Sequence, residues 1–280
     1  MPYARLPARA LLRVTGADAE TFLQTLVTAD LDRLQQGEAR PAALLSPQGK
    51  ILFDFLLSRC EDGFRVDVAR EARADLQKRL TLYKLRAKVT IAPDEEAVFA
   101  VWDEDGPWLA DRRFVGERVG RQYGDAPAGG EEAGAEAFEA RRVRAGIAEA
   151  VSDFPPAEMF PHDVLLDQNG GVSFRKGCFV GQEVVSRMQH RGTARRRLVL
   201  VSAERHLTPG AVVSAGARTL GTLLAATGAD GFALVRIDRL AEALSAGETI
   251  AADGVPLTAT IPPWAGYALP TEAEGSDALA

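Results

Sequence analysis

The sequence predicts an α+β protein with mixed or antiparallel sheets, helices packed on them, and a small antiparallel barrel or sandwich at the C-terminal end. Two observations lead to this fold class. Strand-like and helix-like segments are mixed over the first part of the chain, in a way that favours α+β over a doubly wound sheet. Beyond Leu198 the pattern changes to short apolar runs punctuated by glycine, which is typical of small barrels.

The N-terminal elements follow from the spacing of apolar residues. Leu11–Val14 predicts a short strand, and Thr15 with Asp18 forms a capping box before an apolar-faced helix. Segments 42–45 and 51–57 flank a Pro/Gly turn and predict a hairpin. The further elements predicted here are strands at 64–68, 89–92 and 97–102 and a helix over 70–84.

The later part of the chain divides at two changes of composition. Residues 124–135 are rich in Gly, Ala, Pro and Glu and predict a linker before a helix over 136–146. A domain boundary is expected near 197. The acidic tail from Thr271 has few apolar residues and predicts disorder. The strands expected beyond the boundary are 198–201, 211–213, 219–224, 232–235 and 257–261.

The composition describes a globular protein of two domains, or three small ones. Of the 280 residues, 46% are hydrophobic and 26% are charged, which is ordinary globular usage. A chain of this length buries enough surface to fold without disulfides or metals. The net charge is −6, which argues against direct nucleic-acid binding by bulk charge, so any anion site must be local.

The cysteines and the apolar segments indicate in which cellular compartment the protein is expected. The spacing of Cys60 and Cys178 fits neither a disulfide framework nor a metal-ligand set, so we expect no metal site and a reducing environment. The N-terminal residues lack the apolar core of a signal peptide, and no stretch approaches the ~18 apolar residues of a membrane span. These features predict a cytoplasmic protein without membrane contact.

Cys178 is the first candidate for chemistry. Gly177 and Gly181 let the backbone bend on either side of it, and a short helix is expected to begin at Gln182. Lys176 would share a face with the thiol if this stretch is extended. A cation and a helix N-terminus both stabilise a thiolate, which favours a reactive cysteine. The alternative is a small buried hydrophobe. A histidine base for the thiol is weakly supported, since His190 would lie ~12 Å away along the helix and His162 could approach only from a loop.

Asp54 is the second candidate. It lies in the second strand of the hairpin, where both faces are otherwise apolar. A carboxylate in such surroundings must be paired or hydrogen-bonded, and a ligand is one such partner. The alternatives are a strand-end position near water or a bond to a neighbouring backbone N–H.

A basic cluster follows the short helix. It consists of Arg187, Arg191, Arg195, Arg196 and Arg197. Such a cluster binds the carboxylates of a folate, a phosphate or RNA. The alternative is a solvated surface.

Several motifs occur in an order that resembles one family. Together they resemble the YgfZ-type folate-binding proteins over roughly residues 10 to 265, and the string from Lys176 to Glu183 is the most specific of them. The motifs are Gly16-Ala17-Asp18, the segment 22–30, Leu45-Ser46-Pro47-Gln48-Gly49-Lys50, Asp54, Tyr83-Lys84-Leu85-Arg86, Arg144-Ala145-Gly146-Ile147, Pro155-Pro156-Ala157-Glu158 and Lys176-Gly177-Cys178-Phe179-Val180-Gly181-Gln182-Glu183.

The resemblance implies the fold of the glycine-cleavage T-protein, with three domains around a central channel that holds tetrahydrofolate. The implied domains are a discontinuous folate-binding first domain (1–45 and 137–197), a second α+β domain (46–136), a C-terminal β-barrel (198–270) and a disordered tail (271–280). In this family the cysteine of the motif is tied to activity, which implies a thiol or redox role for Cys178 beside Lys176.

The resemblance also implies a function. This is a tetrahydrofolate-binding accessory protein that assembles or repairs 4Fe–4S clusters in client enzymes, including a tRNA-modifying one, and acts as a monomer with iron–sulfur client or assembly proteins. The implied folate contacts, besides Asp54, are Glu158, Gln182, Arg187 and Arg191.

Two alternatives stay open. The T-protein carries an acidic pair where this chain has Phe53-Asp54, and the single carboxylate argues against turnover as a folate-dependent aminomethyl- or methyltransferase. If the protein is an enzyme, a one-carbon transferase is the expected kind. The other alternative is an RNA-modification partner that docks through the arginine cluster.

Overall fold

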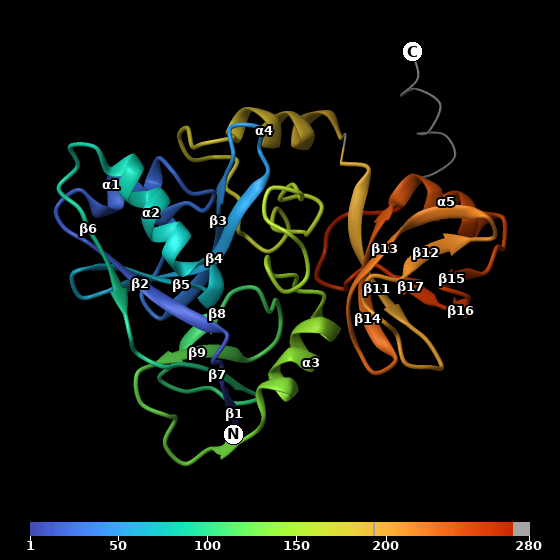
Figure 1. Cartoon of the computed structure of the whole chain (residues 1–280), viewed down its shortest axis with the longest axis horizontal. Helices are drawn as coiled ribbons and strands as arrows, with labels where there is room; N and C mark the ends of the chain where they lie inside the picture. Colours follow the sequence, from blue (N-terminus) through green and yellow to red (C-terminus); the bar gives the residue numbers. More distant parts are fainter. Residues whose placement is uncertain (193, 271–280) are drawn as a thin grey trace. The chain divides into compact units, whose positions relative to one another are not determined.

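The computed structural model describes residues 1–192 and 194–270, which pack as two units (Figure 1). The first unit comprises Met1–Phe138, Glu149–Pro161 and Leu166–Ser186. The second comprises Glu139–Ala148, His162–Leu165 and the described residues from Arg187 onward. The three-domain boundaries stay a prediction, and the tail predicted to be disordered, 271–280, lies outside the described residues.

One ten-stranded sheet forms the frame of the first unit. Most neighbouring strands are antiparallel, but β1 pairs with β10 and β3 with β8 in parallel, so the sheet is mixed, as predicted. In spatial order the strands are β10 (Glu131–Glu132), β1 (Pro2–Arg5), β7 (Val98–Trp102), β9 (Val119–Tyr123), β8 (Leu109–Asp111), β3 (Glu38–Leu45), β4 (Ile51–Cys60), β5 (Gly63–Ala69), β2 (Arg9–Thr15) and β6 (Thr90–Asp94).

Helices and short turns of helix complete this unit. They are α1 (Ala19–Gln24), α2 (Arg73–Lys84), 3-10 turns at Leu31–Arg33 and Arg70–Ala72, and the first parts of α3 (Ala135–Ala145) and α4 (Gln182–Arg191). The predicted hairpin at 42–57 and the helix at 70–84 are therefore present. The predicted capping box is wrong, because the N-cap of α1 is Asp18 and not Thr15. Asp18 makes no side-chain cap bond to the helix, and its Oδ2 instead accepts the backbone N–H of Lys88 at 2.7 Å.

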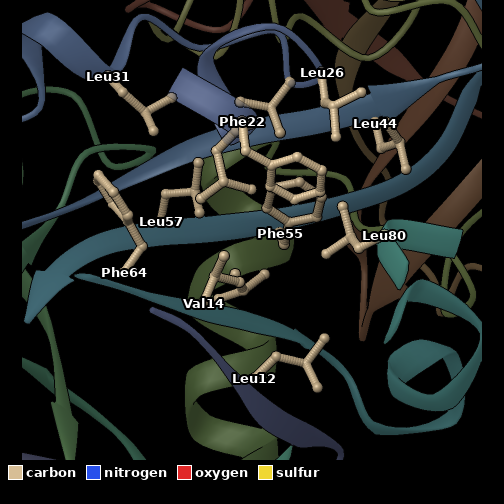
Figure 2. Close-up of a cluster of buried hydrophobic side chains, with 14 of the residues drawn as sticks. Leu12, Val14, Phe22, Leu26, Leu31, Leu44, Phe55, Leu57, Phe64 and Leu80 are labelled. Atoms are coloured by element: carbon tan, nitrogen blue, oxygen red, sulfur yellow. The ribbon is translucent and has the colours of Figure 1, made fainter. Parts of the chain in front are cut away.

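The main core of the first unit lies between β4 and the helices. Phe55 and Leu57 are two residues apart in β4, so their side chains point to the same face of the strand. Figure 2 shows them below Phe22 and Leu26 in that view, with Phe55 toward Leu80 and Leu57 toward Phe64. The buried Leu80 packs α2 against this core. Asp54 lies on the opposite face of β4.

The second unit contains an antiparallel seven-stranded sheet, as the C-terminal pattern predicts. Its strands are β16 (Val255–Pro256), β15 (Ile250–Ala252), β12 (Val212–Ala215), β13 (Arg218–Thr227), β14 (Asp230–Arg236), β11 (Arg196–Ser202) and β17 (Thr258–Thr260). The helix α5 (Ile237–Ser245), which the sequence reasoning did not predict, buries Ile237, Leu240 and Ala243. Among the described residues, no helix is long and apolar enough to span a membrane.

Candidate functional site

Lys176 anchors the loop that carries Cys178. Its Nζ donates hydrogen bonds to the carbonyl oxygens of Val27 and Ala29, both at 2.8 Å. Burial lowers the pKa of this ammonium group to about 8, and the carboxylates of Asp30 and Asp32 partly oppose the shift. The lysine therefore makes backbone contacts that fix the loop.

Cys178 presents its thiol to solvent. The side chain is exposed and the cysteine is free. The next residue, Phe179, is buried, with its ring centroid 5.4 Å from the Nζ of Lys176. An exposed thiol between two anchored residues excludes the alternative of a small buried hydrophobe.

The start of α4 interlocks with the turn between β3 and β4. Gly181 has φ +78, and a Cβ on it would lie 2.5 Å from the carbonyl oxygen of Ser46. Gly49, in the same turn, has φ +79, and a Cβ there would lie 3.0 Å from the Cβ of Val184. Both positions require glycine for two reasons. A side chain would collide with the neighbouring segment, and the positive φ at each position is unfavourable for any residue that has a Cβ. By contrast, Gly177 has open space around it.

Asp54 lies half-buried on β4, and its Oδ1 accepts the backbone N–H of Ala150 at 3.1 Å. Burial, and after it the negative charge of Glu149, raise the pKa of its carboxyl to about 6. The guanidinium groups of Arg9 and Arg113 act in the opposite direction. A carboxyl with such a pKa changes protonation near neutral pH and can donate or accept a proton there.

A buried charge cluster lies beside Asp54. Arg9 Nε is 2.7 Å from Asp67 Oδ1, and Arg9 Nη1 is 3.3 Å from Glu149 Oε2. Arg113 bridges Glu149 Oε1 at 2.5 Å and Asp111 Oδ2 at 2.8 Å. These contacts keep the arginines charged and hold Glu149, and with it the backbone of residue 150, against β4.

Arg121 is a further member of this buried region. Its side chain is fully buried, and its Nε and Nη2 lie 3.4 Å from Asp67 Oδ2 and 3.5 Å from Asp111 Oδ2. The guanidinium carbon is 4.7 Å from the ring centroid of Phe138. Within the described residues, none of its side-chain nitrogens makes a hydrogen bond, so burial lowers its pKa. The sequence reasoning missed this whole cluster.

A cavity of about 600 Å³ adjoins β4 in the first unit. Its walls come from β4, from the start of α2 and from the loop that follows Ala150. The lining residues are Leu52, Phe53, Glu71, Ala72, Asp75, Arg79, Val151, Ser152, Asp153, Phe154, Pro155 and Pro156. Asp54 follows Phe53 directly but is not among them.

Glu158 lies on a segment that runs along the start of β4. Its side chain is exposed, and its carbonyl oxygen accepts a hydrogen bond from Lys50 Nζ at 2.8 Å. Ala157 N–H donates to Ile51 O at 2.7 Å, so this segment is tied to the strand that carries Asp54. Asp54 and Glu158 therefore belong to neighbouring segments of one unit.

The predicted arginine cluster does not form one free cationic surface. Arg196 Nη2 lies 2.6 Å from Asp163 Oδ2, and the buried Arg197 donates to His162 O at 3.0 Å. Arg187 and Arg195 are exposed, whereas the side chain of Arg191 lies outside the described residues. Gln182, half-buried at the start of α4, belongs to the first unit.

The structure thus sorts the predicted site residues into three places. Cys178 and Lys176 share the loop before α4. Asp54 lies on β4 with Glu158 on the segment beside it, and the arginines belong to the second unit. Across the described part of the chain, there is no group of three or more His, Cys, Asp or Glu side chains that could hold a metal ion.

The chain was compared with known proteins. Residues 195–267 match the family model of the C-terminal β-barrel domain of CAF17. Over 93% of its length, the chain is 34% identical to the protein named iron–sulfur cluster assembly factor IBA57, mitochondrial, of Mus musculus and 32% identical to that of Homo sapiens, covering 84% of each.

A solved structure shows the same fold. The glycine cleavage system aminomethyltransferase T from Bartonella henselae matches with a TM-score of 0.74 over 94% of this chain and 86% of that chain. The sequence identity is 16%, so this likeness concerns the fold. The predicted glycine-cleavage T-protein-like fold with a C-terminal barrel is confirmed.

The prediction of a cytoplasmic location is wrong by these comparisons. The mouse and human relatives, which share about a third of their aligned residues with this chain, are both named as mitochondrial proteins. Free cysteines indicate a reducing environment, and that property does not distinguish the cytoplasm from other reducing compartments.

Proposed function

Because the chain belongs to the IBA57 family of iron–sulfur cluster assembly factors, we propose that it is an accessory protein for the assembly or repair of 4Fe–4S clusters in client enzymes. Tetrahydrofolate is its proposed cofactor, and tRNA-modifying enzymes are among its proposed clients. The YgfZ-type proteins are a related family, and their folate-binding property enters here as part of the proposal.

The observation that carries the proposal is the exposed thiol of Cys178. Lys176 and Gly181 fix the backbone on its two sides, so the thiol is held in one place without being covered. Thiolates are the usual ligands of iron–sulfur clusters, and a cluster needs about four of them. With two cysteines in the chain, this protein acts on a cluster held by another protein.

The cavity beside β4 is the proposed site of tetrahydrofolate. It is of a size typical of small-molecule sites, and Phe53 and Phe154 are among its lining residues, although Asp54 itself does not line it. The contact proposed between Asp54 and the pterin stays a prediction; a carboxyl with a pKa of about 6 can both donate and accept hydrogen bonds near neutral pH. The proposed contacts of Glu158, Gln182, Arg187 and Arg191 with the folate stay predictions.

The test is rescue of a 4Fe–4S enzyme in cells that lack the endogenous relative. Wild type should restore the enzyme's activity and Cys178→Ser should not, whereas the matched control Cys60→Ser should restore it. Rescue by Cys178→Ser would refute the role of the thiol. A stoichiometric iron–sulfur chromophore on the monomer purified without oxygen would refute an accessory role.

Folate binding is tested separately on the purified protein. Titration with tetrahydrofolate should show binding that Phe53→Ala and Asp54→Asn weaken. Leu244→Ser, an exposed change in α5, is the control. Equal binding by all four proteins would remove the cofactor from the proposal without touching the thiol.

A second candidate is a folate-dependent aminomethyl- or methyltransferase. One observation favours it: the raised pKa of Asp54 gives a group that can transfer a proton near neutral pH. Turnover of a one-carbon folate donor that Asp54→Asn abolishes would establish this activity. No observation favours the RNA-binding alternative, since Arg196 and Arg197 already have partners within the protein.

A further inference from the structure

The C-terminal end of α2 exposes two leucines. Leu82 is 63% and Leu85 is 88% exposed. Leu76 and Leu80 are buried in the core of the first unit, so α2 already has an apolar face that holds it in place. The exposed leucines do not belong to that face and do not contribute to the core.

Leu85 also has an unfavourable backbone conformation. Its φ is 45° and its ψ is −107°, and Ala87 N–H donates to Lys84 O at 2.8 Å across it. This is the geometry of a II′-type turn with Leu85 at the first central position, where glycine is strongly preferred. A non-glycine residue held in such a conformation is strained, and strain of this kind often marks a functional site. Burial of the side chain does not offset this strain.

The same segment is strongly cationic. Between positions 78 and 88 the sequence has five lysines and arginines and no acidic residue, in a chain of net charge −6. Arg73 at the start of α2 pairs with Glu95 at 2.9 Å. No carboxylate of residues 1–192 or 194–270 pairs with the cations that follow, Lys78, Arg79, Lys84 and Arg86. Cations near a helix C-terminus complement its dipole, but that effect gives no reason for leucines between them.

We infer that Lys78, Leu82, Lys84, Leu85 and Arg86, named here the α2 tip, form a docking surface for an acidic protein partner. The leucines would enter an apolar spot on the partner, and the cations would meet the carboxylates around it. The inference rests on the proposed function only in taking the partner to be a protein, as cluster assembly requires.

Charge and side-chain type favour a protein over other polyanions. Single-stranded nucleic acid is bound by stacking on aromatic rings, which leucines cannot provide. An anionic membrane attracts extended basic surfaces, whereas α2 carries Asp75 in its first turn, Glu71 lies in the 3-10 turn just before it, and the whole chain is acidic. A protein surface with carboxylates around an apolar centre therefore fits the α2 tip better than a nucleic acid or a membrane does.

The direct test uses a defined probe with the purified full chain. The probe is a fluorescent helix-forming peptide in which glutamates surround leucines, and its comparison is the same peptide with serine in place of leucine. We expect the leucine peptide to bind at least about tenfold more tightly, and added salt to weaken it. Equal binding of the two peptides would overturn the inference.

Leu85→Gly separates docking from folding. Glycine relieves the unfavourable φ and removes the side chain, so this variant should be at least as stable as wild type and yet bind the leucine peptide about tenfold less tightly. The matched control is Val212→Ser, which removes a 47% exposed apolar side chain from the second unit. Unchanged binding by Leu85→Gly, or an equal loss with Val212→Ser, would overturn the inference.

Further experiments test whether the α2 tip binds something other than an acidic protein. Leu85-dependent binding to vesicles of anionic lipid or to an RNA oligonucleotide, without peptide binding, would replace the protein partner and overturn the inference. Tighter peptide binding after removal of residues 271–280 would assign the α2 tip to the chain's own acidic tail and overturn it too. In cells, Leu85→Gly should impair rescue of the 4Fe–4S enzyme. If Cys178→Ser rescues fully while Leu85→Gly does not, the role of the thiol fails and the docking surface stands.

Discussion

The ammonium group of Lys176 lies 2.8 Å from the carbonyl oxygen of Val27, and the same group reaches the carbonyl of Ala29 at the same distance. Two backbone segments far apart in the sequence are thereby joined just before Cys178. Burial makes the charged form of the lysine less favourable, which lowers its pKa to about 8. A partly buried ammonium group needs such hydrogen bonds to offset the loss of its hydration.

Lys176→Met should therefore loosen the loop of Cys178. The change leaves two carbonyls without their donor, and an unsatisfied buried acceptor costs about 1–3 kcal/mol. We expect a lower midpoint of urea unfolding and faster reaction of Cys178 with a thiol reagent. Arg175→Met is the control, since that exposed neighbour lies in the same loop. If both variants unfold at the same urea concentration, Lys176 is not an anchor.

The two glycines that flank Cys178 should respond differently to alanine. Gly181→Ala places a methyl group 2.5 Å from Ser46 O at φ +78, so the turn or the start of α4 must move. We expect a loss of more than ~1 kcal/mol in the free energy of unfolding, and reduced rescue of the 4Fe–4S enzyme. Gly177→Ala meets no atom within 4 Å and should be close to neutral. Similar stabilities for the two variants would contradict this account.

The parts of the fold that the sequence predicted well are those with strong local periodicity. The hairpin around the Pro/Gly turn and the helix ending at Lys84 have regular apolar spacing, and their cores depend on that spacing. The helix α5 also has such a pattern in Ile237, Leu240 and Ala243, so this signal was present and was missed. Strands of two or three residues, such as β8 and β10, carry too little pattern to be found.

The candidate site was only partly predictable for a different reason. The exposed Cys178 and the half-buried Asp54 were singled out by their own neighbourhoods in sequence. The partners of Arg9 lie 58 and 140 residues away, at Asp67 and Glu149, and no local pattern indicates such pairs. Lys176 donates to backbone carbonyl oxygens, and because every residue has a carbonyl, the sequence does not indicate these partners.

The arginines after α4 should affect stability more than RNA binding. Arg197 is buried and donates to His162 O at 3.0 Å, so Arg197→Ala should lower the thermal midpoint. The exposed Arg195 is the matched control, and Arg195→Ala should leave the midpoint nearly unchanged. RNA binding at low salt that Arg195→Ala weakens would contradict this view and revive the nucleic-acid alternative.

Asp54 should make the stability of the protein depend on pH in a direction opposite to that of most carboxylates. Its pKa is raised from 3.8 in the unfolded chain to about 6 in the folded protein. Between these values the folded state binds more protons than the unfolded state, so the free energy of unfolding falls as pH rises. Above pH 6 the ionised carboxylate remains an unfavourable buried charge. Since one pKa unit corresponds to about 1.4 kcal/mol, the effect is on the order of 2–3 kcal/mol.

Asp54→Asn should remove this pH dependence. The asparagine oxygen can still accept the N–H of Ala150, and no charge is buried, so the variant should exceed wild type in stability above pH 6 and match it below pH 4. Unfolding in urea across this range measures the difference. Glu149→Gln provides an independent check, because removing that charge should lower the pKa of Asp54 seen by carboxyl NMR. A wild-type Asp54 that titrates near 3.8 would refute both the raised pKa and the acid–base role proposed for it.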